Sequence, residues 1–237
     1  MDAKKFRSLA LQWWRKEIRP LFILVVVMCS ARSSLADWNV VPSGSMKPTI
    51  LEGDRVLVNK LAYDLKVPFT TRHIAEWSNP QRGDIVVFFS PKDGTRLVKR
   101  VIGLPGDTVE MRSEHLFING QPVDYTASDS KLPGQLSDAE RARGVFATEQ
   151  LPTHAHAVMA INGVSAMRTF EPVRVPAGHY FMMGDNRDDS FDSRYFGTVA
   201  RNEIVGRTTH IVLSLNKENF WLPRWDRTFS ALDNPAK

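Results

Sequence analysis

Short apolar runs separated by turn residues fill the chain from residue 37 onward, and this pattern constrains the fold most. The runs are rich in Val, Ile and Phe, and turns such as Leu104–Asp107 and Asn119–Gly120 separate them. Such runs are typical of antiparallel strands. The candidate strands are Arg55–Ala62, Asp84–Phe89, Arg96–Ile102, Thr108–Met111, Leu116–Ile118, Pro172–Val175, His179–Met183 and Thr208–Leu215. The sequence therefore predicts a mainly β fold.

Residues 120–170 differ from the segments on either side. They carry Gly, Ser, Asp and Pro with weak periodicity, which is typical of an insertion. No long amphipathic helix is evident after residue 37. We therefore expect an antiparallel β core formed by two halves, residues 37–119 and 171–237, with a smaller β lobe of residues 120–170 inserted between them.

The N-terminal segment, residues 1–36, has a different character. Apolar residues recur at helical spacing among Lys and Arg from Phe6 to Trp14, which predicts a basic amphipathic helix on a membrane surface. The uncharged run Leu21–Ala31 follows. As a helix it would measure about 16 Å, and Ile18–Ala36 about 28 Å, against a hydrocarbon core of roughly 30 Å. We interpret this segment as a short, single membrane anchor.

A cleaved signal peptide is the alternative for this segment, because Ser34-Leu35-Ala36 fits a small-x-small cleavage site. The long basic region before the apolar run favours an anchor. In either case the basic flank stays in the cytoplasm, and residues from 37 onward lie on the extracytoplasmic side.

Charge distribution argues against nucleic-acid binding. The chain has a net charge of +5, and residues 1–36 contain seven basic and two acidic residues. The remaining residues carry 24 basic and 24 acidic side chains and are neutral. The excess positive charge is thus a feature of membrane topology rather than of a phosphate-binding face.

Two features supply candidate catalytic groups. Ser45 lies in the Gly- and Pro-rich turn Pro42–Thr49, a tight turn that can display a hydroxyl group. Strand alternation places Lys99 and Arg100 on opposite faces of Arg96–Ile102. Only Lys99 can act as a base, because a buried lysine can lose its proton near neutral pH whereas arginine cannot. The non-catalytic alternatives are an ordinary loop and an exposed lysine on an edge strand.

A third polar run, Gly184–Tyr195, contains short acids, hydroxyls and two arginines. Its spacing fails for a calcium loop of the EF-hand type, so a buried polar network is the better interpretation. His154 and His156 alone are a weak metal signal, and no metal or cofactor is expected. A Ser-His-Asp triad stays open, because sequence order does not restrict its geometry.

The three blocks Pro42–Thr49, Lys99–Asp107 and Gly184–Arg194 resemble the signature motifs of bacterial type I signal peptidases, in the family's order and after an N-terminal membrane segment. The resemblance extends over most of residues 37–215. It implies a mostly β membrane-bound serine endopeptidase that removes signal peptides from exported preproteins after a small-x-small motif.

The resemblance also implies roles for individual residues. Ser45 would be the nucleophile and Lys99 the general base, with Ser43 as an oxyanion donor and Ser190 orienting the lysine amine. Asp192 and Arg194 would form a structural ion pair near the site. From their positions beside Ser45, we expect Val41 and Met46 to shape a shallow substrate pocket.

The resemblance implies partners and a location as well. Secretory preproteins and membrane lipid are the expected partners, and the bacterial cytoplasmic (inner) membrane is the expected location, with a cytoplasmic N-terminus. Two residues depart from the family pattern: Asp189 stands where many members have Asn, and Leu97 where some have Tyr.

Two further functions are weighed against this one. A related Ser-Lys peptidase, either a maturation peptidase or a self-cleaving repressor, would share the first two motifs, but a repressor should carry a DNA-binding domain. A non-catalytic, membrane-tethered β module would not need Ser45 and Lys99 together.

Overall fold

The computed structural model describes residues 13–70, 72–127, 136–152, 154–217 and 219–232. Most of the predicted amphipathic N-terminal helix, including Phe6, Leu9 and Ala10, lies outside the described residues. The described chain begins with the short π-helix η1 (Trp14–Ile18) and continues into α2 (Arg19–Ser34).

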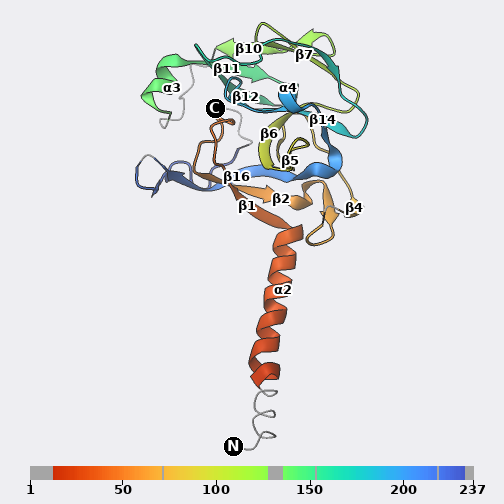
Figure 1. The fold of residues 1–237 in the computed structure, drawn as a ribbon. Helices are drawn as coiled ribbons and strands as arrows, with labels where there is room; N and C mark the ends of the chain where they lie inside the picture. The colour runs from red at the N-terminus through yellow and green to blue at the C-terminus, as the bar shows by residue number, and fades with distance from the viewer. Residues whose placement is uncertain (1–12, 71, 128–135, 153, 218, 233–237) are drawn as a thin grey trace, which may run out of the picture.

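Helix α2 extends away from the β-sheets (Figure 1), and its apolar side chains are exposed. The eight consecutive residues Leu21 to Met28 are 45% to 62% exposed. At 16 residues, α2 is short, and none of the described helices combines the length and apolarity needed to cross a membrane.

A large antiparallel sheet forms the base of the β body. Its strands lie in the order β1 (Ala36–Val40), β2 (Asp54–Asn59), β16 (Ile204–Asn216), β5 (Ile85–Phe89), β6 (Arg96–Gly103), β14 (His179–Met183) and β15 (Val199–Ala200), with β17 (Leu222–Pro223) paired to β16. The 13-residue strand β16 pairs with both β2 and β5. It therefore joins the segment next to α2 to the strands at the centre of the sheet.

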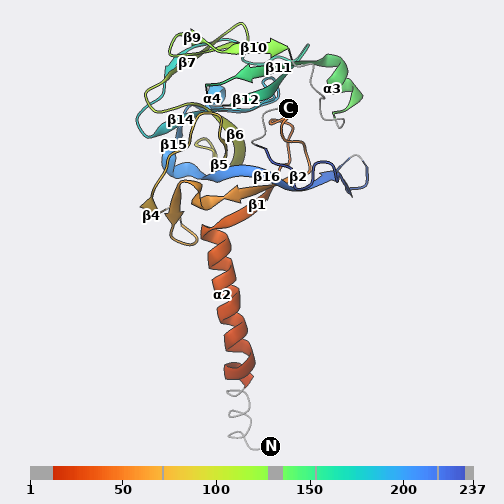
Figure 2. The same ribbon diagram turned by 180° about the vertical axis from the view of Figure 1, so that it is seen from behind.

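Three smaller sheets complete the fold of the described residues. One consists of β13 (Phe170–Arg174), β7 (Thr108–Arg112), β8 (His115–Ile118) and β9 (Gln121–Pro122), and another of β10 (Asp124–Ala127), β11 (Gly144–Gln150) and β12 (Ala155–Ile161). These two lie at the end of the body away from α2, whereas the hairpin of β3 (Asp64–Lys66) and β4 (His73–Glu76) lies near the α2 junction (Figures 1 and 2). The short helices are η2 (Lys60–Ala62), α3 (Asp138–Arg143), α4 (Ser193–Phe196) and η3 (Arg201–Glu203).

The mainly β, antiparallel prediction is confirmed, with shifts at strand ends. The predicted strand Arg55–Ala62 is wrong at its C-terminal end, where the Asn59 side chain accepts a hydrogen bond from Leu61 N and starts η2. The weakly periodic region 120–170 contains two seven-residue strands, β11 and β12. The sequence did not locate them, because Ala and polar residues on this sheet obscure the alternation.

The core consists of three apolar clusters that follow the sheets. One packs Val41, Met46 and Ile50 of the loop after β1 against Val56, Ile85 and Ile211. A second includes Val86, Phe88 and Val101 of the large sheet, and the third lies between β7, β8 and β14. The loop that carries Ser45 is thus fixed by core packing on one side.

Candidate active site

The side chains of Lys99 and Arg100 lie on opposite faces of strand β6, as the alternation predicted. β6 lies between β5 and β14, so it is not an edge strand, and Lys99 is only 3% exposed. The alternative of an exposed lysine on an edge strand is therefore wrong. Arg100 points away from Lys99's face and donates to Asp185 and to Gly83 O.

Lys99 Nζ and Ser45 Oγ form a buried hydrogen bond of 2.6 Å. Burial lowers the pKa of Lys99 from 10.5 to about 8, while the carboxylates of Asp192, Asp185 and Asp189 oppose the shift. The Ser43 hydroxyl lies 3.3 Å from Ser45 Oγ. A serine hydroxyl beside an amine that loses its proton near pH 8 is the arrangement of an activated nucleophile.

The loop that follows β14 holds the Ser45 turn in place. Asn186 N donates to Ser45 O, and the Asn186 side chain donates to Gly44 O. Thr49 Oγ1 donates to Asp185 at 2.5 Å, and Arg100 donates to both oxygens of the same carboxylate. Asp185 therefore connects the turn of the serine to the strand of the lysine.

This positioning role was not predictable from the sequence for Asp185, Asn186, Arg100 and Thr49. Asp185, Asn186 and Arg100 lie in the quoted motifs, and Thr49 ends the first of them. Their link depends on contacts between segments far apart in the chain. No local sequence pattern pairs these four residues.

Asp192 and Arg194 form the predicted ion pair, and both are buried. Arg194 donates Nε to Oδ1 at 2.8 Å and Nη2 to Oδ2 at 2.9 Å. Asp192 also accepts from Gly184 N and begins α4 by accepting from Arg194 N. The pair therefore fixes the segment between Gly184 and α4.

Gly184 separates Ser45 from Ser190. A Cβ added to Gly184 would overlap Ser190 Oγ and the Ser45 carbonyl oxygen, so these two serines approach each other closely because residue 184 has no side chain. Ser190 Oγ is buried and has no hydrogen-bond partner among the described residues. Orientation of Lys99 by Ser190 therefore stays a prediction.

The histidine alternative receives no support from the geometry. His156 is buried within the polar network, with Nε2 3.4 Å from Glu149 and 3.8 Å from Asp185. Burial, together with the charge of the nearby Arg100, lowers the pKa of His156 to about 4. Across the described ranges, Ser45 Oγ hydrogen-bonds Lys99 and Ser43 rather than an imidazole.

A small pocket of about 150 Å³ opens beside Ser45. Val41 and Met46, which are almost fully buried, contribute to its wall. The other lining residues come from the end of β1, from the loop that follows it and from β6: Asn39, Val40, Pro42, Ser43, Arg96, Leu97, Val98 and Lys99. The structure thus brings the predicted pocket residues to the same place as the serine and the lysine.

Comparison with known proteins decides the family. Residues 14–213 match the family model described as signal peptidase, peptidase S26. The chain belongs to this signal peptidase family.

The relatives include signal peptidase I of Pseudomonas fluorescens, which is 38% identical over 211 residues, covering 84% of this chain and 71% of that protein. Signal peptidase I of Pseudomonas aeruginosa is 38% identical over 214 residues, with the same coverage. Signal peptidase I P of Bacillus subtilis subsp. natto is 34% identical over 203 residues, covering 85% of this chain and 88% of the relative. The chain is therefore a hydrolase of the signal peptidase I type, a serine endopeptidase.

A solved signal peptidase I structure from Enterococcus faecalis V583 is 36% identical in sequence. The match covers 55% of this chain and 97% of the chain in that structure, with a TM-score of 0.34.

The two departures from the signal peptidase pattern, Leu97 and Asp189, both bear on the candidate active site. Leu97 lines the pocket beside Ser45 and packs against the core of the large sheet. Asp189 is exposed, and its carboxylate raises the pKa of Lys99. Leu97 therefore affects the wall of the pocket, and Asp189 affects the pKa of Lys99.

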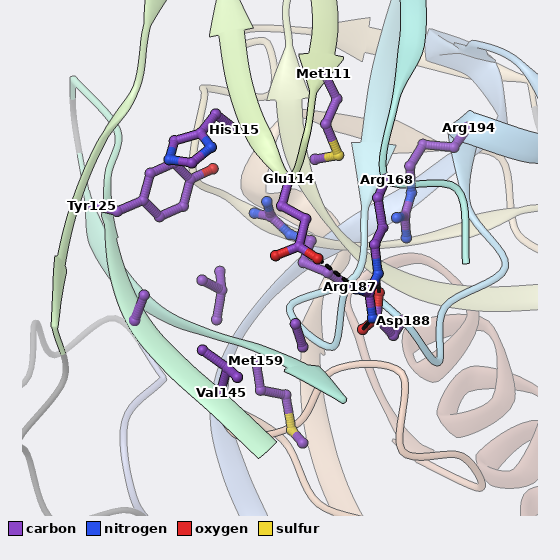
Figure 3. Close-up of a pocket in the computed structure, with 13 residues that line it drawn as sticks. Met111, Glu114, His115, Tyr125, Val145, Met159, Arg168, Arg187, Asp188 and Arg194 are labelled. Carbon is purple, nitrogen blue, oxygen red and sulfur yellow. Dashed lines mark hydrogen bonds and ion pairs between the residues drawn. The ribbon is translucent and has the colours of Figure 1, made fainter. Parts of the chain in front are cut away.

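A second cavity in this signal peptidase, of about 190 Å³, lies between β7, β8 and the sheet of β10 to β12 (Figure 3). Its wall is mainly apolar and includes Met111, Val145 and Met159. Arg168 bridges Glu114 at 2.6 Å and Asp188 at 2.8 Å along one side. Ser45 and Lys99 are not among its lining residues, so it is separate from the candidate active site.

Proposed function

We propose that this chain removes N-terminal signal peptides from exported preproteins, with Ser45 as the nucleophile and Lys99 as the general base. The 2.6 Å contact between Lys99 Nζ and Ser45 Oγ carries the proposal. Family membership supports the activity, and the pKa of Lys99 near 8 supports its use as a base. A base is most effective when its pKa lies near the working pH.

In the first half of the reaction, neutral Lys99 accepts the proton of the Ser45 hydroxyl as Oγ attacks the scissile carbonyl carbon. The resulting ammonium then gives this proton to the leaving amine as the peptide bond breaks. The signal peptide remains attached to Ser45 as an ester. The preprotein, now shortened to its mature chain, leaves with a free amino terminus.

In the second half, Lys99 is neutral again and accepts a proton from a water molecule that attacks the ester. The ammonium returns the proton to Ser45 Oγ as the signal peptide leaves with a free carboxylate. Ser43, with its hydroxyl 3.3 Å from Ser45 Oγ, and the Ser45 backbone N–H are suited to stabilise the oxyanion of both steps.

Substrate choice is assigned to the pocket beside Ser45. At about 150 Å³ it offers little space, and the buried side chains of Val41 and Met46 restrict its wall. Larger side chains next to the scissile bond would collide with this wall. That restriction supports a small residue directly before the scissile bond, and the small-x-small motif is what the family resemblance implies.

Membrane attachment is proposed for α2. Its eight consecutive exposed apolar side chains, Leu21 to Met28, support contact with lipid, because an apolar surface of this extent is unfavourable in water. With the basic N-terminal flank in the cytoplasm, the β body lies on the extracytoplasmic face of the inner membrane. The cleavage regions of membrane-inserted preproteins would emerge close to the site.

The division of the chain into lobes is also a proposal. Residues 37–119 and 171–237 would form the catalytic core, with 120–170 as the inserted lobe and 1–36 as the anchor. The sheet of β10, β11 and β12 lies wholly within 120–170 and supports this division. The capping-box helix α3 also lies in this segment and contacts Lys47 through Glu140 at 2.6 Å.

The proposal is tested by incubating the purified full chain in detergent with a model preprotein and identifying the cleaved bond by mass spectrometry. The expected product begins directly after a small-x-small motif. Ser45→Ala should give no product, whereas Ser113→Ala, in an exposed turn between β7 and β8, should cleave normally. Cleavage elsewhere, or equal cleavage by Ser45→Ala, would refute the assignment.

A further inference from the structure

A basic pocket lies where α2 meets the β body. Its volume is about 550 Å³, within the usual range of small-molecule sites. Among the described residues, its lining includes four cationic side chains, Lys60, Lys66, Arg72 and Arg96, and no carboxylate. The wall also includes Ser33 and Ser34, the last residues of α2.

Two of these cations are partly committed to the fold. Lys60 Nζ donates to Arg32 O and Ser33 O, and so caps the negative end of the α2 dipole. Lys66 Nζ donates to Ile204 O and lies 3.6 Å from Asp64. Burial lowers the pKa of both lysines, so an anion in the pocket would favour their charged forms.

The other two cations carry the charge that is available to a ligand. Arg72 is exposed, and its guanidinium has no partner in the described part of the chain. Arg96 donates to Asn39 and lies 3.7 Å from Asp37. Even when Asp37 and Asp64 are counted, the four cations leave a net charge of +2. Ser34 Oγ, in a residue 7% exposed, is also unpartnered within the described ranges.

The surroundings identify the kind of anion. Phe69 lines the pocket and is 72% exposed. Its backbone N–H donates to Ser33 Oγ at the end of α2, the helix whose apolar side chains Leu21 to Met28 are exposed. The hairpin of β3 and β4, which contributes Lys66, lies beside this junction in both views (Figures 1 and 2). A ligand with an anionic head and apolar chains would place its head in the pocket and its chains along α2.

We infer that this pocket binds the phosphate headgroup of an anionic phospholipid of the outer leaflet, with the acyl chains lying along α2. The inference rests on the proposed membrane attachment of α2. Basic pockets next to membrane helices bind such headgroups through charge and hydrogen bonding. Arg96 lines both this pocket and the pocket beside Ser45, so a bound lipid would hold the catalytic site close to the membrane surface.

Native mass spectrometry of the full chain in detergent tests the inference, with dioleoylphosphatidylglycerol and dioleoylphosphatidylcholine as probes. The unaltered chain should retain the anionic lipid preferentially. Lys66→Gln/Arg72→Gln should weaken its retention about thirtyfold, since each basic side chain near a lipid surface contributes roughly a factor of five. Arg112→Gln/Arg174→Gln removes the same charge from the distant β7–β13 sheet and should have no effect.

Equal retention of the anionic lipid by the unaltered chain and Lys66→Gln/Arg72→Gln would overturn the inference. Displacement of the lipid by an equal concentration of inorganic phosphate would overturn the assignment to a lipid. If the double variant does not fold, exposed Arg72→Gln alone should still lose about fivefold. Cleavage of a soluble peptide reports on the catalytic proposal alone and should be unchanged in all of these variants, which separates the two proposals.

Discussion

Raising the pH from 7 to 9 is expected to increase kcat/KM on a soluble peptide about tenfold. Burial lowers the pKa of Lys99 to about 8. The neutral amine is then roughly one eleventh of the enzyme at pH 7 and ten elevenths at pH 9. At the ordinary pKa of 10.5, only about one molecule in 3,000 would be competent at pH 7. Burial therefore increases the reactive form roughly 300-fold at that pH.

Asp189→Asn tests the cause of this profile as well as its position. The Asp189 carboxylate raises the pKa of Lys99 against the effect of burial. Its removal should shift the midpoint of the profile to lower pH and increase cleavage at pH 7. Because Asp189 is exposed, the shift should be clearest at low ionic strength. Glu171→Gln, an exposed carboxylate on β13, is the matched control and should leave the midpoint unchanged.

The assay is initial-rate cleavage of a soluble peptide by the detergent-solubilised chain between pH 5 and 10. Because kcat/KM reports the free enzyme, its midpoint gives the pKa of the unoccupied site. A midpoint near 6.5 would indicate a histidine base. That result, or a shift to higher pH in Asp189→Asn, would refute the assignment of the profile to Lys99.

Three further variants test the oxyanion donor, the close packing and the anchor. Ser43→Ala should lower kcat about 10²- to 10³-fold with little change in KM; a loss under threefold would exclude Ser43 as an oxyanion donor. Gly184→Ala should lower the melting temperature and abolish cleavage, because its Cβ would overlap Ser190 and Ser45; an unchanged melting curve would contradict this packing. Deletion of residues 1–36 should spare cleavage of soluble peptides but reduce that of membrane-inserted preproteins, through lower local concentration. Mass spectrometry of the membrane-purified chain should find the N-terminus retained, and a mature mass beginning at Asp37 would refute the anchor.

Strand alternation placed Lys99 and Arg100 on opposite faces, side-chain chemistry made Lys99 the candidate base, and the resemblance to signal peptidases decided for it. Leu97, Lys99 and Val101 fall on one face of β6, and the structure places Lys99 in the interior beside Ser45. The ion pair of Asp192 and Arg194 was also predicted, by resemblance, and its partners are two residues apart. Features that depend on local spacing or on a recognised motif could therefore be predicted from the sequence.

Contacts between distant segments could not be predicted from the sequence. Asp185 meets Thr49 and Arg100 across separations of 136 and 85 residues, and no local pattern pairs these residues. The basic pocket likewise combines the end of α2, the β3–β4 hairpin and β6. Strands β11 and β12 were missed for a different reason, since their polar and small residues hide the period of two.

The most direct test of the central claim is the dyad cycle of Ser45→Ala, Lys99→Ala and the double variant, measured as kcat on a model preprotein. Two groups that act as one unit should give the same loss singly and together. Lys99→Arg should be equally inactive, because the guanidinium cannot act as a base. Circular dichroism would verify that each variant is folded. Near-normal cleavage by Lys99→Ala, or a double variant much slower than either single one, would contradict a Ser45–Lys99 dyad.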